Sequence, residues 1–249
     1  MDYANREVFP SSPLALVAAE VRFNDSPRLR QQSTIDAISM ALESTLPVQG
    51  QQQTDLNVAV RAGGVPRVKV SQGRIMKDLK STSAMTLTPD RMSFETTAYT
   101  EFSDFRQRVV TCCRALVDAG VTPALRRVGL RYIDEIRVPT DAVADAREWR
   151  TWIDARLVDH LLIGPADAAV PQTEGTILYS LGDRKGLNFR FAARPKGAVV
   201  SPATLVRRPF DADLPFFVLD LDGYQNFVGP DATLFSVEVV EKTLDSVHG

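Results

Sequence analysis

The segment from Arg126 to Pro139 (RRVGLRYIDEIRVP) constrains the fold more than any other stretch, because its apolar and charged residues alternate. The apolar side carries Val128, Leu130, Tyr132, Ile136 and Val138, and the charged side carries Arg127, Arg131, Glu135 and Arg137. A period of two with β-branched and aromatic residues on one side predicts an antiparallel strand with one buried face. Asp134 falls among the apolar residues, so we expect a bulge or a hydrogen-bonded buried carboxylate there.

Periodicity elsewhere in the chain predicts further strands and helices. Alternating or continuous apolar residues predict strands at 14–23, 56–60, 65–79, 85–87, 92–94, 177–181, 187–191 and 216–221, with one more near 199–206. Helical spacing predicts helices at 33–46, 100–120, 147–162 and from residue 233 to the end. Residues 196–214 otherwise read as a long loop, whose apolar residues either fold back on the core or contact a partner.

The order of these elements repeats once along the chain. Residues 1–122 and residues 123–249 each read as strand, helix, three or four strands, helix, and the two halves share one core. Their first strands have similar local sequences, since Ala19–Phe23 (AEVRF) resembles Asp134–Val138 (DEIRV). The predicted fold is therefore α+β, an antiparallel sheet with helices packed on one face, in two β-α-β(3-4)-α pseudo-repeats of saddle-like or helix-grip-like form.

The central run Arg127–Asp134 (RVGLRYID) resembles the signature R-x-G-L-R-Y-I-[DN] of an uncharacterised, sporadically distributed family of prokaryotic proteins of similar length. The resemblance extends to Pro13-Leu14, to the region of Tyr99 and Phe105, and to Leu219–Asp222 (LDLD). It implies no reaction, because that family has no established one. In the family, the last helix continues beyond a histidine equivalent to His248 into a segment that contains aromatic residues.

Composition and the positions of the cysteines restrict the partners and the cellular compartment that we expect for this protein. The chain has 249 residues, 44% hydrophobic and 24% charged, with a formal charge of −2, so no overall field attracts nucleic acid or an anionic membrane. Adjacent residues Cys112 and Cys113 on a predicted helix cannot form a relaxed disulfide, which indicates a reducing compartment. With no signal peptide and no membrane-spanning stretch, we expect a cytoplasmic protein.

Catalytic and metal-binding patterns are weak in this sequence. His160 and His248 lie in different halves at predicted helix ends, away from any cluster with the spacing of metal ligands, so we expect no metal and no cofactor. Asp220 and Asp222 point to the same side of a strand and could pair for acid–base work or bind a metal, but a solvated sheet face is the favoured explanation. The sequence leaves open whether the chain is an enzyme, and the weak catalytic patterns favour a protein that is not one.

The candidate binding residues are Arg127, Arg131, Arg137, Glu135, Arg207 and Arg208. The arginines of the central strand either grip an acidic segment or phosphates, or form a cross-strand ladder with neighbouring acids. We expect a non-enzymatic protein that binds another protein, as a chaperone-like or antitoxin-like partner, with a homodimer as a further possibility. Nucleic-acid binding through an arginine-rich saddle face is one alternative. A small-molecule-binding or hydrolytic protein with a helix-grip cavity that uses Asp134, Asp220 or Asp222 is the other.

Overall fold

A computed structural model of the chain describes residues 12–50, 53–59, 67–138, 143–199 and 205–248. Its strands are β1 (Leu14–Phe23), β2 (Val48–Gln49), β3 (Gln53–Ala59), β4 (Arg67–Lys77), β5 (Ser83–Thr88), β6 (Arg91–Thr96), β7 (Leu125–Arg137), β8 (Thr173–Ser180), β9 (Lys185–Arg194) and β10 (Phe216–Asn226). Its α-helices are α1 (Gln32–Leu42), α2 (Phe102–Asp118) and α3 (Val237–His248). Its 3-10 helices are η1 (Pro27–Arg30), η2 (Ala146–Thr151), η3 (Ala155–Leu157), η4 (Asp159–Ile163) and η5 (Gly229–Asp231).

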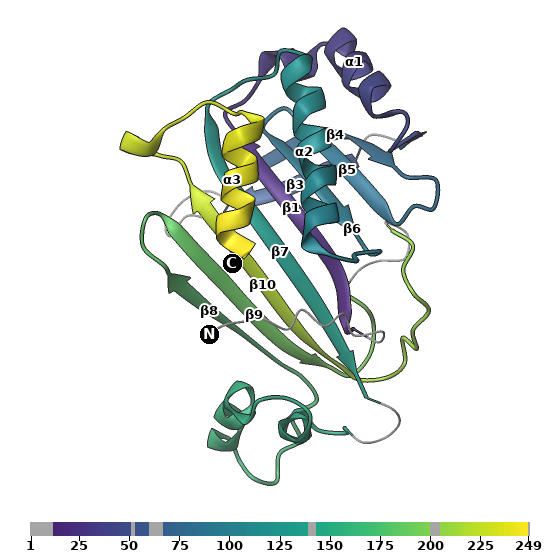
Figure 1. Cartoon of the computed structure of the whole chain (residues 1–249). Helices are drawn as coiled ribbons and strands as arrows, with labels where there is room; N and C mark the ends of the chain where they lie inside the picture. The colour runs from purple at the N-terminus through teal and green to yellow at the C-terminus, as the bar shows by residue number, and fades with distance from the viewer. Residues whose placement is uncertain (1–11, 51–52, 60–66, 139–142, 200–204, 249) are drawn as a thin grey trace.

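The strands form one antiparallel sheet, and the three α-helices lie on one of its faces (Figure 1). The strand order is β2-β4-β5-β6-β1-β7-β10-β9-β8, with β3 paired to β4 beside this path. The chain is thus α+β with a large antiparallel sheet, as the alternating patterns predicted. No helix in the described part of the chain has both the length and the apolar composition needed to cross a lipid bilayer.

The main core lies between the sheet and the helices. From β1, Val17, Ala19 and Val21 are fully buried, and Val109 and Leu116 of α2 pack into the same cluster. Each large apolar side chain removed from water in this way contributes about 1.5–3 kcal/mol to folding. Gly120 ends the α2 segment with a φ of 77°, a left-handed conformation that glycine adopts without strain.

β1 and β7 form the centre of the sheet, and Glu20 pairs with Gly129 there. Going outward, β1 is followed by β6, β5 and β4, whereas β7 is followed by β10, β9 and β8. The main core also draws on both halves of the chain, with Val21 and Leu116 from the first half and Leu130 and Leu244 from the second. The two halves therefore contribute to one continuous sheet and one main cluster.

The predicted helix at 147–162 is wrong, because this segment forms the three short helices η2, η3 and η4. Asp145 accepts a hydrogen bond from the Arg147 backbone N–H and starts η2, and Asp154 does the same for the Arg156 backbone N–H at η3. These repeated N-terminal caps restart the helix instead of extending it. The apolar residues of this segment still pack against the sheet, since Trp149 is 1% exposed and its ring centre lies 5.5 Å from that of Phe217.

The last helix begins at Val237 and not at residue 233 as predicted. Backbone hydrogen bonds from Leu125 to Thr233 and from Phe235 to Pro123 hold this stretch extended. Leu234 is consequently 62% exposed, and Phe235 is buried in its place. The strand predicted near 199–206 falls mostly outside the described residues.

Candidate functional site

The charged side of β7 faces away from the helices, as the alternation predicted. Val128 and Leu130 lie in the core beneath the helices, so Arg127, Arg131 and Arg137 project from the opposite face of the sheet. We call this opposite side the open face. Gly129 also lies in this row, and a Cβ atom there would come within 3.4 Å of Asp222 Oδ1.

Arg131 forms the centre of an ion-pair network on the open face. Its Nε and Nη2 atoms donate to the two carboxylate oxygens of Asp220, each at 2.7 Å, and Arg190 Nη1 donates to the same carboxylate at 3.2 Å. The hydrogen bond to Asp220 raises the pKa of Arg131. The side chain of Asp220 is 8% exposed, whereas Arg131 and Arg190 are 41% and 44% exposed. The carboxylate is therefore held inside, and both cations reach solvent.

Arg127 forms a second network on the open face, four residues before Arg131 along β7. Its Nη2 donates to both oxygens of Asp222, at 3.0 and 2.8 Å, and Asn188 donates to the same carboxylate at 3.0 Å. The guanidinium also lies 4.1 Å from the centre of the Tyr224 ring. Both arginines thus form the cross-strand ladder that was one of the two interpretations, but with Asp220 and Asp222 as the acids.

Glu135, Arg137 and Arg207 are brought together in a buried cluster, although Arg207 is remote in sequence. Glu135 is 1% exposed and accepts hydrogen bonds from Arg207 at 2.6 Å, from the Val199 backbone N–H at 2.7 Å and from Arg137 at 2.8 Å. Burial opposes ionisation of this carboxylate, but the hydrogen bonds from Arg207, Val199 and Arg137 outweigh it and lower the pKa of Glu135.

Arg137 attaches the long segment before β10 to the end of β7. It donates to the backbone carbonyls of Gly197, Asp211 and Leu214, and its guanidinium lies 4.7 Å from the ring centre of Phe210. Leu205 is fully buried in a cluster with Ile75 and Ala84. The described part of the loop therefore folds back on the core, and the donors of Arg137 and Arg207 are largely used inside the chain.

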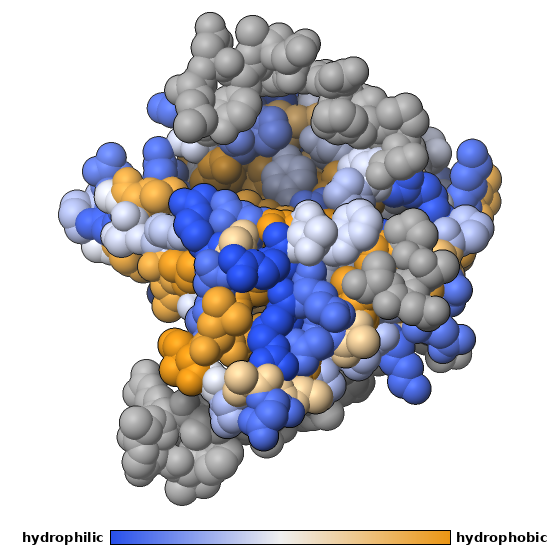
Figure 2. Space-filling view, turned by 90° about the horizontal axis from the view of Figure 1, so that it is seen from below, coloured by the Kyte–Doolittle hydropathy of each residue, from blue (hydrophilic) through white to orange (hydrophobic). Residues whose placement is uncertain are grey.

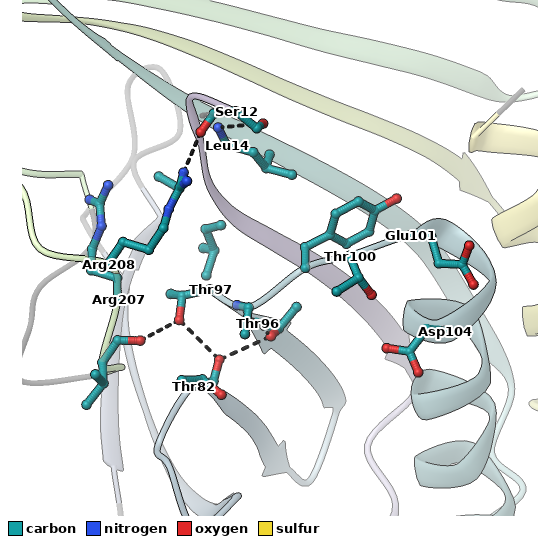
Figure 3. A pocket seen from close by; sticks show the side chains of 15 residues that line it. Ser12, Leu14, Thr82, Thr96, Thr97, Thr100, Glu101, Asp104, Arg207 and Arg208 are labelled. Carbon is teal, nitrogen blue, oxygen red and sulfur yellow. Dashed lines mark hydrogen bonds between the residues drawn. The ribbon is translucent and has the colours of Figure 1, made fainter. Parts of the chain in front are cut away.

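Arg208 lies apart from this cluster, where it donates to the backbone carbonyl of Ser12. It lines a hollow of about 1010 Å³ between the start of β1, the start of α2 and residues 206–208. Figure 3 shows its two arginines, Arg207 and Arg208, on one side and the carboxylates of Glu101 and Asp104 on the other. Thr96 and Thr97 hydroxyls donate to the Thr82 carbonyl between them. The surface of the hollow is more apolar than polar, with charges of opposite sign at its two ends.

Several surface residues were not identified from the sequence. Arg190, Asn188 and Tyr224 join the networks on the open face, and only the register of β7, β10 and β9 brings them there. Tyr224 could have been found by continuing the alternation of β10 beyond Leu221.

Figure 2, a view from the end where η2–η4 lie, shows hydrophobic areas beside a central hydrophilic band. Trp152, Leu162 and Ile163 of this end are 48%, 56% and 89% exposed.

The structure places the remaining chemically interesting residues in packing roles. Cys112 and Cys113 are free thiols in the core, and burial raises the pKa of Cys112 to about 12 and that of Cys113 well above its ordinary value. His248 stacks on Phe102 with ring centres 3.8 Å apart, and its Nδ1 lies 3.0 Å from the Tyr132 hydroxyl. Among the described residues, no group of three or more His, Cys, Asp or Glu side chains is arranged to hold a metal ion.

Asp134 sits beside a β-bulge, but the irregularity lies in the neighbouring strand. β1 shifts register between Leu14, which pairs with Asp134, and Leu16, which pairs with Ile133. Burial raises the pKa of Asp134.

Comparison with models of known protein families and with curated proteins gave no match, so the family resemblance of the central strand stays a prediction.

Proposed function

We propose that the chain is a non-enzymatic binding protein that takes up an extended segment of another protein along β8. The observation that carries this proposal is that β8 lies at the edge of the sheet and exposes apolar side chains. β8 is eight residues long and, within the described part of the chain, pairs only with β9, which leaves one edge of backbone groups unpaired. Ile177, Leu178 and Tyr179 follow one another and are 38%, 73% and 44% exposed.

Edge strands normally carry features that prevent pairing with another chain. Charged side chains (lysine above all), proline and bulges are the common ones. The β8 sequence TEGTILYS contains neither lysine nor proline, and its one charged residue, Glu174, is near the beginning. Successive strand residues point to opposite faces of the sheet. The apolar side chains at 177–179 could therefore contact a strand added beside β8 on both faces of the sheet. Main-chain hydrogen bonds would then supply affinity, and these side chains selectivity.

The sheet surface next to β8 extends this apolar region. Ile177 and Tyr179 pair with Phe189 and Leu187 of β9, and all four lie on the face that carries the helices. Phe189 and Leu187 are only half-buried. In the first half of the chain, by contrast, Ile38 and Leu42 of α1 are fully buried in the main cluster. An extended segment along β8 would cover apolar surface that the second half leaves open.

Affinity capture with a matched pair of variants tests this proposal. Leu178→Lys places a charge on the β8 edge region, and Leu79→Lys makes the same change at an 81% exposed leucine in the turn after β4. The tagged wild type and Leu79→Lys should retain one stoichiometric protein partner from the source cells, which Leu178→Lys should lose. Recovery of all three proteins alone at every salt concentration contradicts the proposal. Self-association of the wild type, abolished by Leu178→Lys, would identify a second copy as the partner.

We further propose that the two halves are copies of one ancestral module in a saddle-like arrangement. The strand order supports this, because β6-β1 and β10-β7 each join the first strand of a half to its last long strand. In each half an α-helix is the next α-helix or strand along the chain: α2 follows β6, and α3 follows β10 after the short helix η5. Superposition of β1, β5, β6 and α2 on β7, β9, β10 and α3 in an experimental structure tests it. A rotation far from 180°, or no common Cα trace, contradicts it.

A further inference from the structure

Three arginines occupy one cross-strand row at an end of the sheet. Arg91 of β6 pairs with Arg22 of β1, and Arg22 pairs in turn with Arg127 of β7. Directly opposite residues of an antiparallel pair lie on the same face with Cβ atoms about 4.5–5.5 Å apart, and like charges in such positions are destabilising. A row of three like charges across adjacent strands therefore needs counter-charges.

The counter-charges that the described residues supply to this row are shared or lie to one side. A single carboxylate, that of Glu20, contacts both Arg22 at 2.6 Å and Arg91 at 3.3 Å. Asp222 takes up only the Nη2 end of Arg127, whose buried Nε has no hydrogen-bond acceptor in the part of the chain that the structure describes. Arg127 thus keeps a donor that no acceptor among the described residues satisfies.

A fourth arginine adds to the same place. The register of β1 and β7 shifts between Arg22, which pairs with Arg127, and Phe23, which pairs with Leu125, so Arg126 is the extra residue of a bulge. Its side chain is exposed and makes no hydrogen bond or ion pair with any residue that the structure describes. Arg22, Arg91, Arg126 and Arg127 together line a hollow of about 460 Å³, with Asn226 beside them.

Asp90 is the one acidic residue among the described residues that line this hollow, and Thr88 donates a hydrogen bond to its carboxylate at 3.0 Å. The four guanidinium groups face three carboxylates, those of Asp90, Glu20 and Asp222, so the hollow keeps an excess of one positive charge. A positively charged concave surface of this kind concentrates anions. The planar fork of donors on each arginine matches the geometry of a phosphate group. The volume lies within the range of pockets for small ligands.

We propose that this arginine hollow, formed by Arg22, Arg91, Arg126, Arg127 and Asn226, binds the phosphate group of a small ligand. Single-stranded nucleic acid is disfavoured because it needs free aromatic faces for base stacking. Tyr224 is the aromatic residue next to the hollow, and Arg127 covers its ring at 4.1 Å. Its hydroxyl end lies over Gly186, where a Cβ atom would be only 2.6 Å from the oxygen. The site is separate from β8 and does not depend on the function proposed for that strand.

Calorimetric titration at constant ionic strength, balanced with chloride, tests the hollow. The probes are inorganic phosphate, ribose 5-phosphate and a single-stranded DNA oligonucleotide. The variants are Arg22→Gln and Arg126→Gln, and the control is Arg150→Gln, since the Arg150 side chain is 52% exposed against 50% for Arg22. Thermal unfolding in phosphate-free buffer verifies that each variant folds like the wild type.

We expect saturable binding of ribose 5-phosphate, and of inorganic phosphate more weakly, to the wild type and to Arg150→Gln. Each hollow variant should lose about tenfold in affinity, as removal of one charge-assisted hydrogen-bonding group predicts. The proposal is overturned if neither small probe saturates, or if all three variants respond alike. Binding of the oligonucleotide without any response to the small phosphates overturns it too, in favour of nucleic acid.

Discussion

Arg207 Nη1 donates to Glu135 Oε1 at 2.6 Å, which fixes the segment before β10 to the end of β7 across 72 residues of sequence. Arg207 is 11% exposed and Glu135 is 1% exposed, so this is a buried ion pair. Such pairs contribute little when intact relative to apolar replacements, but removal of one partner leaves the other charge buried and unpaired.

Glu135→Gln should therefore lower the free energy of unfolding by about 3 kcal/mol, because Arg137 and Arg207 lose their counter-ion. Urea unfolding at neutral pH measures this change. The control is Glu174→Gln, which removes a 73% exposed partner of Arg194 and should change stability by under about 0.5 kcal/mol. An equal effect of the two substitutions would show that the Glu135 cluster does not hold the loop.

The same cluster predicts a pH dependence with a definite sign. The pKa of Glu135 is lowered from an ordinary value of 4.5, so its contribution to stability is complete above pH 4.5. The contribution is lost as pH falls through the folded-state pKa. The stability difference between wild type and Glu135→Gln should thus be constant from pH 7 down to about 5 and shrink in more acidic buffer. A difference that grows on acidification would contradict the assignment.

Asp134 should show the opposite behaviour, because burial raises its pKa above the ordinary 3.8. Its ionised form is disfavoured in the folded state, so the chain loses stability as pH rises from 3.8 through the folded-state pKa. We expect Asp134→Asn to be more stable than the wild type at pH 7, with no difference below the ordinary pKa of the carboxyl group. Thermal unfolding across a pH series measures this, and a less stable variant at neutral pH would refute it.

The Arg131–Asp220 pair should be energetically coupled despite its partly exposed cation. A double-mutant cycle with Arg131→Met and Asp220→Asn should give a coupling of about 1 kcal/mol, reduced by solvent screening of Arg131. The exposed Arg194–Glu174 pair provides the reference and should give a value close to zero. Equal couplings in the two cycles would mean that the low exposure of Asp220 has no energetic effect.

Trp149 should be the residue on which the docking of η2–η4 depends. Trp149→Ala should destabilise the chain by about 3–5 kcal/mol, because a large cavity opens against Phe217. Trp152 lies three residues later and is 48% exposed, so Trp152→Ala should change stability by less than about 1 kcal/mol. Chemical denaturation of both variants provides the comparison, and similar losses would argue against the packing described for η2.

The two cysteines should be inert in the folded protein. Both are buried and burial raises the pKa of each thiol, so almost no thiolate is available to react at neutral pH. A thiol reagent should modify neither residue in native buffer and both in denaturant. Rapid modification of the native protein would show that α2 opens locally.

Elements with a strong local pattern were predicted well. β1 forms at the expected residues 14–23, and α2 lies within the expected 100–120. The helix at 147–162 was wrong because apolar residues three and four apart suit a series of capped 3-10 turns as well as an α-helix. The caps at Asp145 and Asp154 decide between the two, and their hydrogen bonds are visible only in the folded chain.

By itself, the sequence determined which side of each strand is apolar, because that depends only on the alternation of residues along one segment. It therefore placed Arg127, Arg131 and Arg137 on one face. The tertiary structure decided which residues meet there, because register joins segments far apart in the chain. It opposed Arg22 to both Arg91 and Arg127, paired Arg131 with Asp220, and brought Arg207 to Glu135. No local pattern encodes these distances, since strand pairing is fixed by the burial of the whole sheet.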